Sequence, residues 1–230
     1  IRDARTYAKD DKSIILAAYL KPFREGKREK ALPAAKLLMG SIVSNGATHL
    51  LTGENQTALT QGYYSDYTKF SDSEAEAIRQ YYDYMIRYEN LFFDPELQDV
   101  TMTHTGWDNY EYQCTSHKVS SYGEAGKIWM ILRERDYRKC IYLLNLCGQS
   151  EDYWNEGKEE PNIQKDIKFT VQVDTPVEKI CFSTPDGENM DAIELSFTER
   201  ATKTGKFIDF TVPSLNYWTT IWIDTRKGTI

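Results

Sequence analysis

A histidine and a carboxylate flank a short apolar run in GATHLLTGEN, residues 46–55. His49 stands at one end of the run and Glu54 at the other, with glycines on either side. Imidazole and carboxylate groups exchange protons and form hydrogen bonds with substrate hydroxyls, so the pair is a candidate for the rim of a functional site. The alternative is a buried strand with a hydrogen-bonded core histidine and a solvated acidic end.

A long loop, residues 54–70, follows this run. In a β/α barrel the reactive groups lie at the C-terminal ends of the strands and on the loops behind them, and long ordered loops are often functional. Tyr19, near the end of the preceding apolar run, can bind substrate at such a rim or close a core layer. A solvated connection with incidental polarity is the alternative for the loop. Its polar residues beyond Glu54 include Asn55, Tyr63, Tyr64 and Asp66.

Motifs for a self-contained reaction are absent from the sequence. A glycosidase needs two carboxyl groups flanking one bond, whereas Glu54 and Asp66 are the only suitably placed acids in the loop and neither lies in a distinctive motif. His49, His104 and His117 lack metal-ligand spacing, and the H-E-x-x-H, P-loop, G-x-G-x-x-G and G-x-S-x-G motifs do not occur. We therefore expect no catalytic pair, no metal and no cofactor.

The charge balance argues against a nucleic-acid partner. The 230 residues include 28 basic and 35 acidic side chains, which give a formal charge of −7, whereas nucleic-acid binders concentrate Lys and Arg. The sequence has no apolar run long enough to cross a membrane, so we expect no membrane partner either. With 40% hydrophobic and 13% aromatic residues, the chain has ample material for a packed core.

Strands and helices alternate in the first part of the chain. The run SIILAAYL, residues 13–20, is typical of a parallel strand covered on both faces. A helix is predicted over 32–46, a second buried strand over 48–52, and a helix over 71–95 that starts with a Ser-x-x-Glu capping box. This βαβα order indicates an α/β architecture.

Two parallel strands do not form a stable sheet alone, because each leaves an unpaired edge and an uncovered face. We expect the missing strands to come from upstream sequence or from another copy of the chain that associates through the open strand edges. The sequence has no initiator Met and enters the first apolar run after a short charged stretch, so we expect a fragment of a longer protein.

From about Val100 the hydrophobic period changes to two. Short strand-like stretches separated by Gly, Pro, Asp and Asn are typical of an antiparallel β-sandwich. We predict two domains, residues 1–96 and residues 97–230. The predicted strands cover 127–135, 138–147, 166–174, 178–184, 192–197, 206–213 and 218–224.

Two Tyr-Trp pairs occur beside polar residues in this second part, Tyr153-Trp154 and Tyr217-Trp218. Such rings can stack on the C–H faces of sugars. They can also pack between the sandwich and its neighbour, since amphipathic aromatics favour interfaces.

Several stretches, taken in order over nearly the whole chain, resemble glycoside hydrolase family 66, the bacterial endo-dextranases and cycloisomaltooligosaccharide glucanotransferases. The resemblance implies that the first part corresponds to the last two βα units of a (β/α)8 barrel and the rest to an antiparallel sandwich. His49, Gly53 and Glu54 match the family's pattern at the eighth barrel strand, but Leu51 stands where the family commonly has an acid. The stretches are SIILAAYLKPF, GATHLLTGEN with ALTQGYYSDY, AIRQYYDYMIRYENLFFDPELQDV, YLLNLCGQSEDYWNEGKEEP and FTVPSLNYWTTIWI.

The resemblance also implies an activity and a location. Family members cleave α-1,6-glucan with retention, using an Asp nucleophile and a Glu acid/base on earlier barrel strands, and no position here matches either residue. Our main hypothesis is a C-terminal piece of a bacterial, secreted or cell-envelope dextranase-like enzyme acting on α-1,6-glucan or isomaltooligosaccharide. Tyr19, His49 and Glu54 would contact substrate, and the piece alone would be inactive. The alternative is a non-catalytic carbohydrate-binding or structural sandwich, with Trp154 or Trp218 stacking on sugar.

Overall fold

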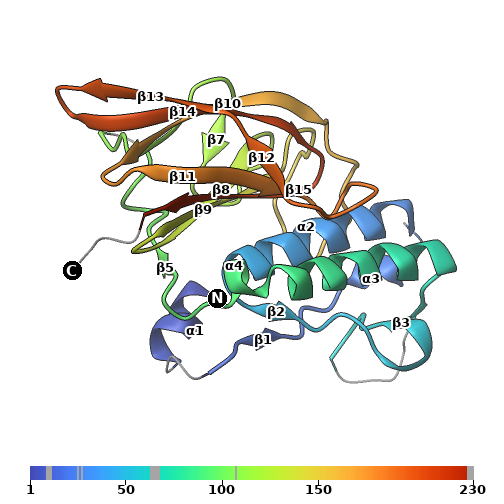
Figure 1. Ribbon diagram of the computed structural model, residues 1–230. Helices are drawn as coiled ribbons and strands as arrows, with labels where there is room; N and C mark the ends of the chain where they lie inside the picture. Colours follow the sequence, from blue (N-terminus) through green and yellow to red (C-terminus); the bar gives the residue numbers. More distant parts are fainter. Residues whose placement is uncertain (9–11, 25, 27, 63–67, 107, 227–230) are drawn as a thin grey trace. The chain divides into compact units, whose positions relative to one another are not determined.

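The computed structural model describes residues 1–230 except 9–11, 25, 27, 63–67, 107 and 227–230 (Figure 1). The chain divides into two compact units. The first comprises Ile1–Pro95 and Gly148–Pro161, and the second comprises Glu96–Cys147 and Asn162–Ile230. The sequence predicted a single cut after residue 96, whereas the structure places the later segment 148–161 with the first unit.

The first unit is built around a short parallel strand pair. β1 pairs with β2 in the register Ile15↔Thr48 and Leu16↔His49, and α2 and α3 lie side by side over one face of the pair (Figure 1). Parallel strands joined through a helix follow the βαβα order expected from the sequence. The elements are α1 (Arg2–Tyr7), β1 (Ile15–Leu16), η1 (Lys21–Phe23), η2 (Arg28–Lys30), α2 (Ala31–Ser44), β2 (Thr48–His49), η3 (Glu54–Gln56), β3 (Thr57–Ala58), β4 (Thr68–Lys69), α3 (Asp72–Arg87) and α4 (Glu89–Phe92).

The expectation of strands covered on both faces is wrong for the described residues. β1 is far shorter than the predicted strand over 13–20, and the exposed fraction of Ile15 is 65%. Leu50, just beyond β2, is 44% exposed. Successive side chains of a strand point to opposite faces, so these two lie on the face that α2 and α3 do not cover. The described residues form no closed barrel, because the first unit has only the two parallel strands β1 and β2 among them.

α3 begins where the sequence predicted and ends earlier. The Ser71 side chain accepts a hydrogen bond from the Glu74 amide, and the Glu74 carboxylate accepts one from the Ser71 amide, which completes the predicted capping box. The helix stops at Arg87 because Tyr88 leaves helical geometry with φ −113° and ψ 30°, and α4 follows as a separate turn.

Glu74 also fixes the segment that leads into α2. Its carboxylate forms a two-pronged ion pair with Arg28, with Nε–Oε1 and Nη2–Oε2 distances of 2.8 and 2.6 Å. Burial alone would raise the pKa of Glu74, but the bonds from Arg28 and Ser71 outweigh burial and hold that pKa below its usual value. The Glu74 carboxylate thus caps the start of α3 and also forms a long-range ion pair with Arg28.

The second unit is a β-sandwich. One sheet has the order β13-β14-β10-β6, and the other has the order β12-β11-β15-β9-β8-β5, with β7 added in parallel beside β8. Apolar side chains from both sheets, such as Met130, Phe169, Ile208 and Ile221, form one core. The strands are β5 (Gln98–Asp99), β6 (Tyr112–Cys114), β7 (Val119–Ser120), β8 (Ile128–Arg135), β9 (Arg138–Asn145), β10 (Gln164–Val173), β11 (Val177–Ser183), β12 (Ile193–Leu195), β13 (Phe197–Thr202), β14 (Gly205–Leu215) and β15 (Trp218–Thr225).

Seven of these strands overlap the seven predicted from the period-two pattern. β13 was missed because it is an edge strand with five consecutive exposed residues, so it shows no apolar alternation. β5, β6 and β7 have only two or three residues each, too few for a periodic signal.

We predict that Glu74→Ala lowers the free energy of unfolding by about 2 kcal/mol, because it removes the capping box and leaves Arg28 without its carboxylate. The matched control is Glu76→Ala in the same helix. Glu76 pairs only with exposed Arg79, and the effect should stay within about 0.5 kcal/mol. Urea unfolding followed by circular dichroism measures both, and equal losses would contradict the role given to Glu74.

Candidate functional site at the carboxyl ends of β1 and β2

The segments that follow β1 and β2 are tied together by backbone hydrogen bonds. The Leu20 amide donates to the Leu59 carbonyl at 3.1 Å, and the Leu59 amide donates to the Leu51 carbonyl at 2.8 Å. The loop after β2 therefore turns back and lies against the segment that leaves β1. This edge gathers the residues that the sequence singled out, as expected for parallel strands whose carboxyl ends meet.

His49 lies in the core of the first unit. Its side chain is 1% exposed, and Nε2 donates to the Ala18 carbonyl oxygen at 2.9 Å. Nδ1 is buried without a hydrogen-bond partner among the described residues. Burial lowers the pKa of His49, since a charged ring in this position would lose its hydration. The neutral ring ties β2 to the residues beyond β1, and this arrangement leaves it no open face for a direct substrate contact.

Tyr82 of α3 closes the other edge of β2. Its hydroxyl donates to the His49 carbonyl at 2.8 Å and accepts from the Leu51 amide at 3.2 Å. The His49 carbonyl and Leu51 amide point away from β1, so a side chain satisfies groups that a neighbouring strand would otherwise pair. This part of the strand edge is thus not open for association with another chain, contrary to the expectation from sequence.

Glu54 stands on a bent and strained turn, η3, five residues beyond the end of β2. The side chain is exposed, and its carbonyl accepts a hydrogen bond from Thr57 Oγ1 at 2.6 Å. Asn55 and Gln56 follow with φ of 55° and 58°, two consecutive non-glycine residues in the left-handed region. A Cβ at Gly53 would lie 2.8 Å from Thr57 Oγ1, so a larger residue would displace this hydroxyl from its bond to the Glu54 carbonyl. The turn holds the carboxylate in solvent at the strand end, and such strain is concentrated at functional sites.

Tyr19 is half-buried at the same edge and packs against the loop after β2. A Cβ added at Gly62 would lie 3.1 Å from Cε2 of the Tyr19 ring, so the glycine permits close contact with the loop. The remaining loop candidates, Tyr63, Tyr64 and Asp66, lie outside the described residues. Among the described residues, Glu54 and Tyr19 therefore offer one exposed carboxylate and one phenol, which can bind hydroxyls but cannot supply the two carboxyl groups of a glycosidase.

The two tryptophans predicted to stack on sugars differ in exposure. Trp218 begins β15 and is completely buried, so its ring has no face for a ligand and the predicted stacking role does not fit. Trp154 is 53% exposed, but it lies in the segment 148–161 and thus in the first unit rather than the sandwich.

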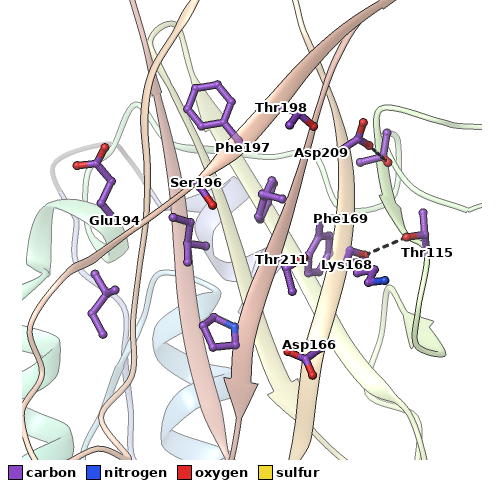
Figure 2. Close-up of a pocket in the computed structure, with 15 residues that line it drawn as sticks. Thr115, Asp166, Lys168, Phe169, Glu194, Ser196, Phe197, Thr198, Asp209 and Thr211 are labelled. Carbon is purple, nitrogen blue, oxygen red and sulfur yellow. Dashed lines mark hydrogen bonds between the residues drawn. The ribbon is translucent and has the colours of Figure 1, made fainter.

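A groove of about 800 Å³ in the sandwich was not anticipated from the sequence (Figure 2). Asp209 lines it and bonds to Arg200 at 2.7 Å and to the Thr170 hydroxyl. Burial would raise the pKa of Asp209, but these two partners lower it overall. The polar lining residues of β10 and β14, such as Lys168, Thr170 and Asp209, alternate with core residues as in any strand of a sandwich, which is why sequence reasoning gave no signal.

The described residues contain no group of three or more His, Cys, Asp and Glu side chains that could hold a metal ion. In the same residues, no helix combines the length and the apolar character that a bilayer crossing requires. The four cysteines are unpaired thiols, and burial raises the pKa of Cys140 to about 11, which makes it unreactive at neutral pH.

Comparison with known proteins places this arrangement in a class. The chain has the fold of part of a cycloisomaltooligosaccharide glucanotransferase from Paenibacillus sp., crystallised with cycloisomaltoheptaose. The TM-score is 0.73 at 23% identity, and the match covers 82% of this chain and 27% of that one. The chain therefore shares the fold of a segment of that protein.

The family follows from the sequence match. The model of glycosyl hydrolase family 66 matches residues 1–222, so the chain belongs to this family, and the resemblance noted from sequence is confirmed. Two cycloisomaltooligosaccharide glucanotransferases from Niallia circulans are 28% and 26% identical over 193 and 191 residues, or 83% and 82% of this chain. The chain spans 19% of the length of each.

We predict that the unfolding temperature falls as the pH drops below about 6.5, in part because of His49. The folded-state pKa of this residue lies below its usual 6.5, so the unfolded chain takes up a proton first and is favoured in that range. His49→Gln keeps a donor for Ala18 but cannot titrate, and its unfolding temperature should fall less between pH 7.5 and 5. His117→Gln, in the second unit, is the control and should follow the wild type. Identical pH dependence in His49→Gln would contradict this assignment.

Proposed function

We propose that this chain is the part of a glucan-acting glycosyl hydrolase family 66 enzyme that contributes the last two βα units of a (β/α)8 barrel and the sandwich that follows. The observation that carries the proposal is the uncovered face of the β1–β2 pair, with Ile15 and Leu50 exposed on it. Burying side chains of this size contributes about 1.5–3 kcal/mol each. A barrel interior would bury this face, since side chains from all strands fill it.

The length of the related proteins supports the same proposal. The match covers 27% of the Paenibacillus chain, and the curated relatives are about five times longer than the matched part. The Asp nucleophile and the Glu acid/base of a retaining reaction would then be supplied by other strands of the barrel. The reaction would need no metal or cofactor, because two carboxyl groups suffice for double displacement.

The proposed substrate is an α-1,6-linked glucan or isomaltooligosaccharide, in line with the names of the relatives. Such polymers do not enter cells, so the enzyme would act outside a bacterial cell or in its envelope. Glu54 and Tyr19 would bind sugar hydroxyls at the rim. His49 would act as a positioning residue, because its ring holds the two strand ends together while its own side chain stays buried.

The alternative of a glucan-binding sandwich has weaker support. Trp218 is buried, and Trp154 belongs to the first unit, so neither residue supplies an exposed platform on the sandwich. Self-association through open edges is also less well supported, because Tyr82 and Leu59 already bond to the edge of β2. Dextran-affinity electrophoresis of the sandwich and light scattering of the whole chain test these two alternatives.

We predict that the 230-residue chain alone releases no reducing sugar from dextran, since the Asp nucleophile and the Glu acid/base of the proposed reaction would lie on other strands of the barrel. The measurement is a reducing-end assay at high protein concentration. Turnover by this polypeptide that disappears in Glu54→Gln or in another acid variant would overturn the proposal.

In the complete enzyme, Glu54→Gln should raise KM for isomaltooligosaccharides about tenfold while kcat changes less than threefold. One charge-assisted hydrogen bond to a hydroxyl accounts for a loss of this size. Glu89→Gln, an exposed acid at the start of α4, is the control and should leave both constants unchanged. An unchanged KM in Glu54→Gln would remove this residue from the proposed contacts.

A further inference from the structure

The segment 148–161 carries two adjacent exposed aromatic rings. Tyr153 is 67% exposed and Trp154 is 53% exposed, although large aromatic side chains usually bury most of their surface. The Trp154 side chain has no hydrogen bond or aromatic neighbour among the described residues. The segment contains no helix or strand, so something other than regular secondary structure must hold these rings in place.

A buried lysine organises the turn beneath the rings. Lys158 is almost fully buried, and its Nζ donates to Glu151 Oε1 at 2.5 Å and to the Tyr153 carbonyl at 2.6 Å. Gln149 and Glu159 close the base of the segment. The Gln149 amide nitrogen donates to the Glu159 carbonyl at 2.7 Å, and the Glu159 amide donates back at 3.1 Å. A buried charge with three oxygen partners, the third being the Glu156 carbonyl at 3.4 Å, makes the conformation of this turn specific.

The same segment is attached to the residues that follow β1. The Lys158 amide donates to the Lys30 carbonyl at 3.0 Å, and Glu156 and Glu159 form ion pairs with Lys21 and Lys30. A Cβ at Gly157 would lie 2.8 Å from Lys30 Cβ, so the two backbones approach as closely as glycine allows. Lys21 is two residues beyond Tyr19. The segment is therefore fixed at the carboxyl end of β1, the edge that carries the candidate rim.

We propose that Tyr153 and Trp154 form a stacking subsite for α-1,6-glucan chains at this rim, outside the reacting bond. The inference rests on the proposed function, because it takes the substrate class from there. Aromatic faces bind the C–H faces of pyranose rings, and burial of apolar surface drives the contact without any charge. Because the turn is already ordered, little conformational entropy is lost when the chain binds.

The chemistry around the rings fits a sugar ligand. Asp152 is exposed and directly precedes the pair in the sequence, so its carboxylate offers an acceptor for the hydroxyl groups of a stacked glucose unit. An α-1,6-glucan is flexible, so a second holding point outside the reactive centre favours long chains over short ones. The subsite should therefore change affinity for polymers and leave reactions of short oligosaccharides unaffected.

The test uses the complete enzyme and compares dextran with isomaltotriose. Trp154→Ala should lower kcat/KM for dextran about three- to tenfold, the range expected for one aromatic contact, with kcat/KM for isomaltotriose unchanged. Trp154→Phe should restore most of the activity on dextran. Lys158→Met keeps both rings but removes the charge that orders the turn, and it should reproduce the dextran-specific loss.

A surface tyrosine in the second unit provides the control. Tyr122 is also well exposed, and Tyr122→Ala should leave both substrates unaffected. If the enzyme acts on α-1,6-glucan and Trp154→Ala matches the wild type on both substrates, the subsite is refuted and the rings serve another partner. An equal loss on both substrates also refutes it. If the wild-type enzyme does not act on α-1,6-glucan at all, the proposed function itself fails.

Discussion

The first unit depends on one constraint, the need of a short parallel strand pair to satisfy its backbone groups and cover its faces. α2 and α3 cover one face, and the ring of His49 links β2 to Ala18 beyond β1. On the other edge, the Tyr82 hydroxyl and the Leu59 amide bond to backbone groups that a further strand would otherwise pair. The opposite face, with Ile15 and Leu50, stays exposed in the first unit, and the proposed barrel would bury it.

Polar side chains that the sequence marks as candidates for chemistry act here mainly in hydrogen bonds and ion pairs that stabilise the fold. His49 and Glu74 are both buried. His49 bonds to the Ala18 carbonyl and Glu74 to the Arg28 side chain, and both partners are distant in the sequence. Glu54 differs, because a left-handed turn after β2 holds it in solvent. Exposure therefore separates the residues that hold the fold together from those that can bind a ligand, since residues of the same chemical type occur in both roles.

The segment 148–161 shows why a single domain boundary in the sequence does not separate the two units. It lies in the sequence between β9 and β10 of the sandwich, yet its lysine and glutamates bond to Lys21 and Lys30 of the first unit. Its exposed aromatic pair is consequently held at the edge where the loops after β1 and β2 meet. A segment inserted between two sandwich strands is thus part of the first unit.

The sequence by itself determined the features that local patterns encode. The Ser71–Glu74 capping box, the period-two strands such as β8 and β14, and the family all follow from short stretches read in order. Tertiary structure decided the burial of His49 and Trp218, the polar edge strand β13, and the unit to which Trp154 belongs. The physical reason is that a helix cap or an alternating strand pattern involves residues near one another in the sequence. Burial instead arises from segments that meet only after folding.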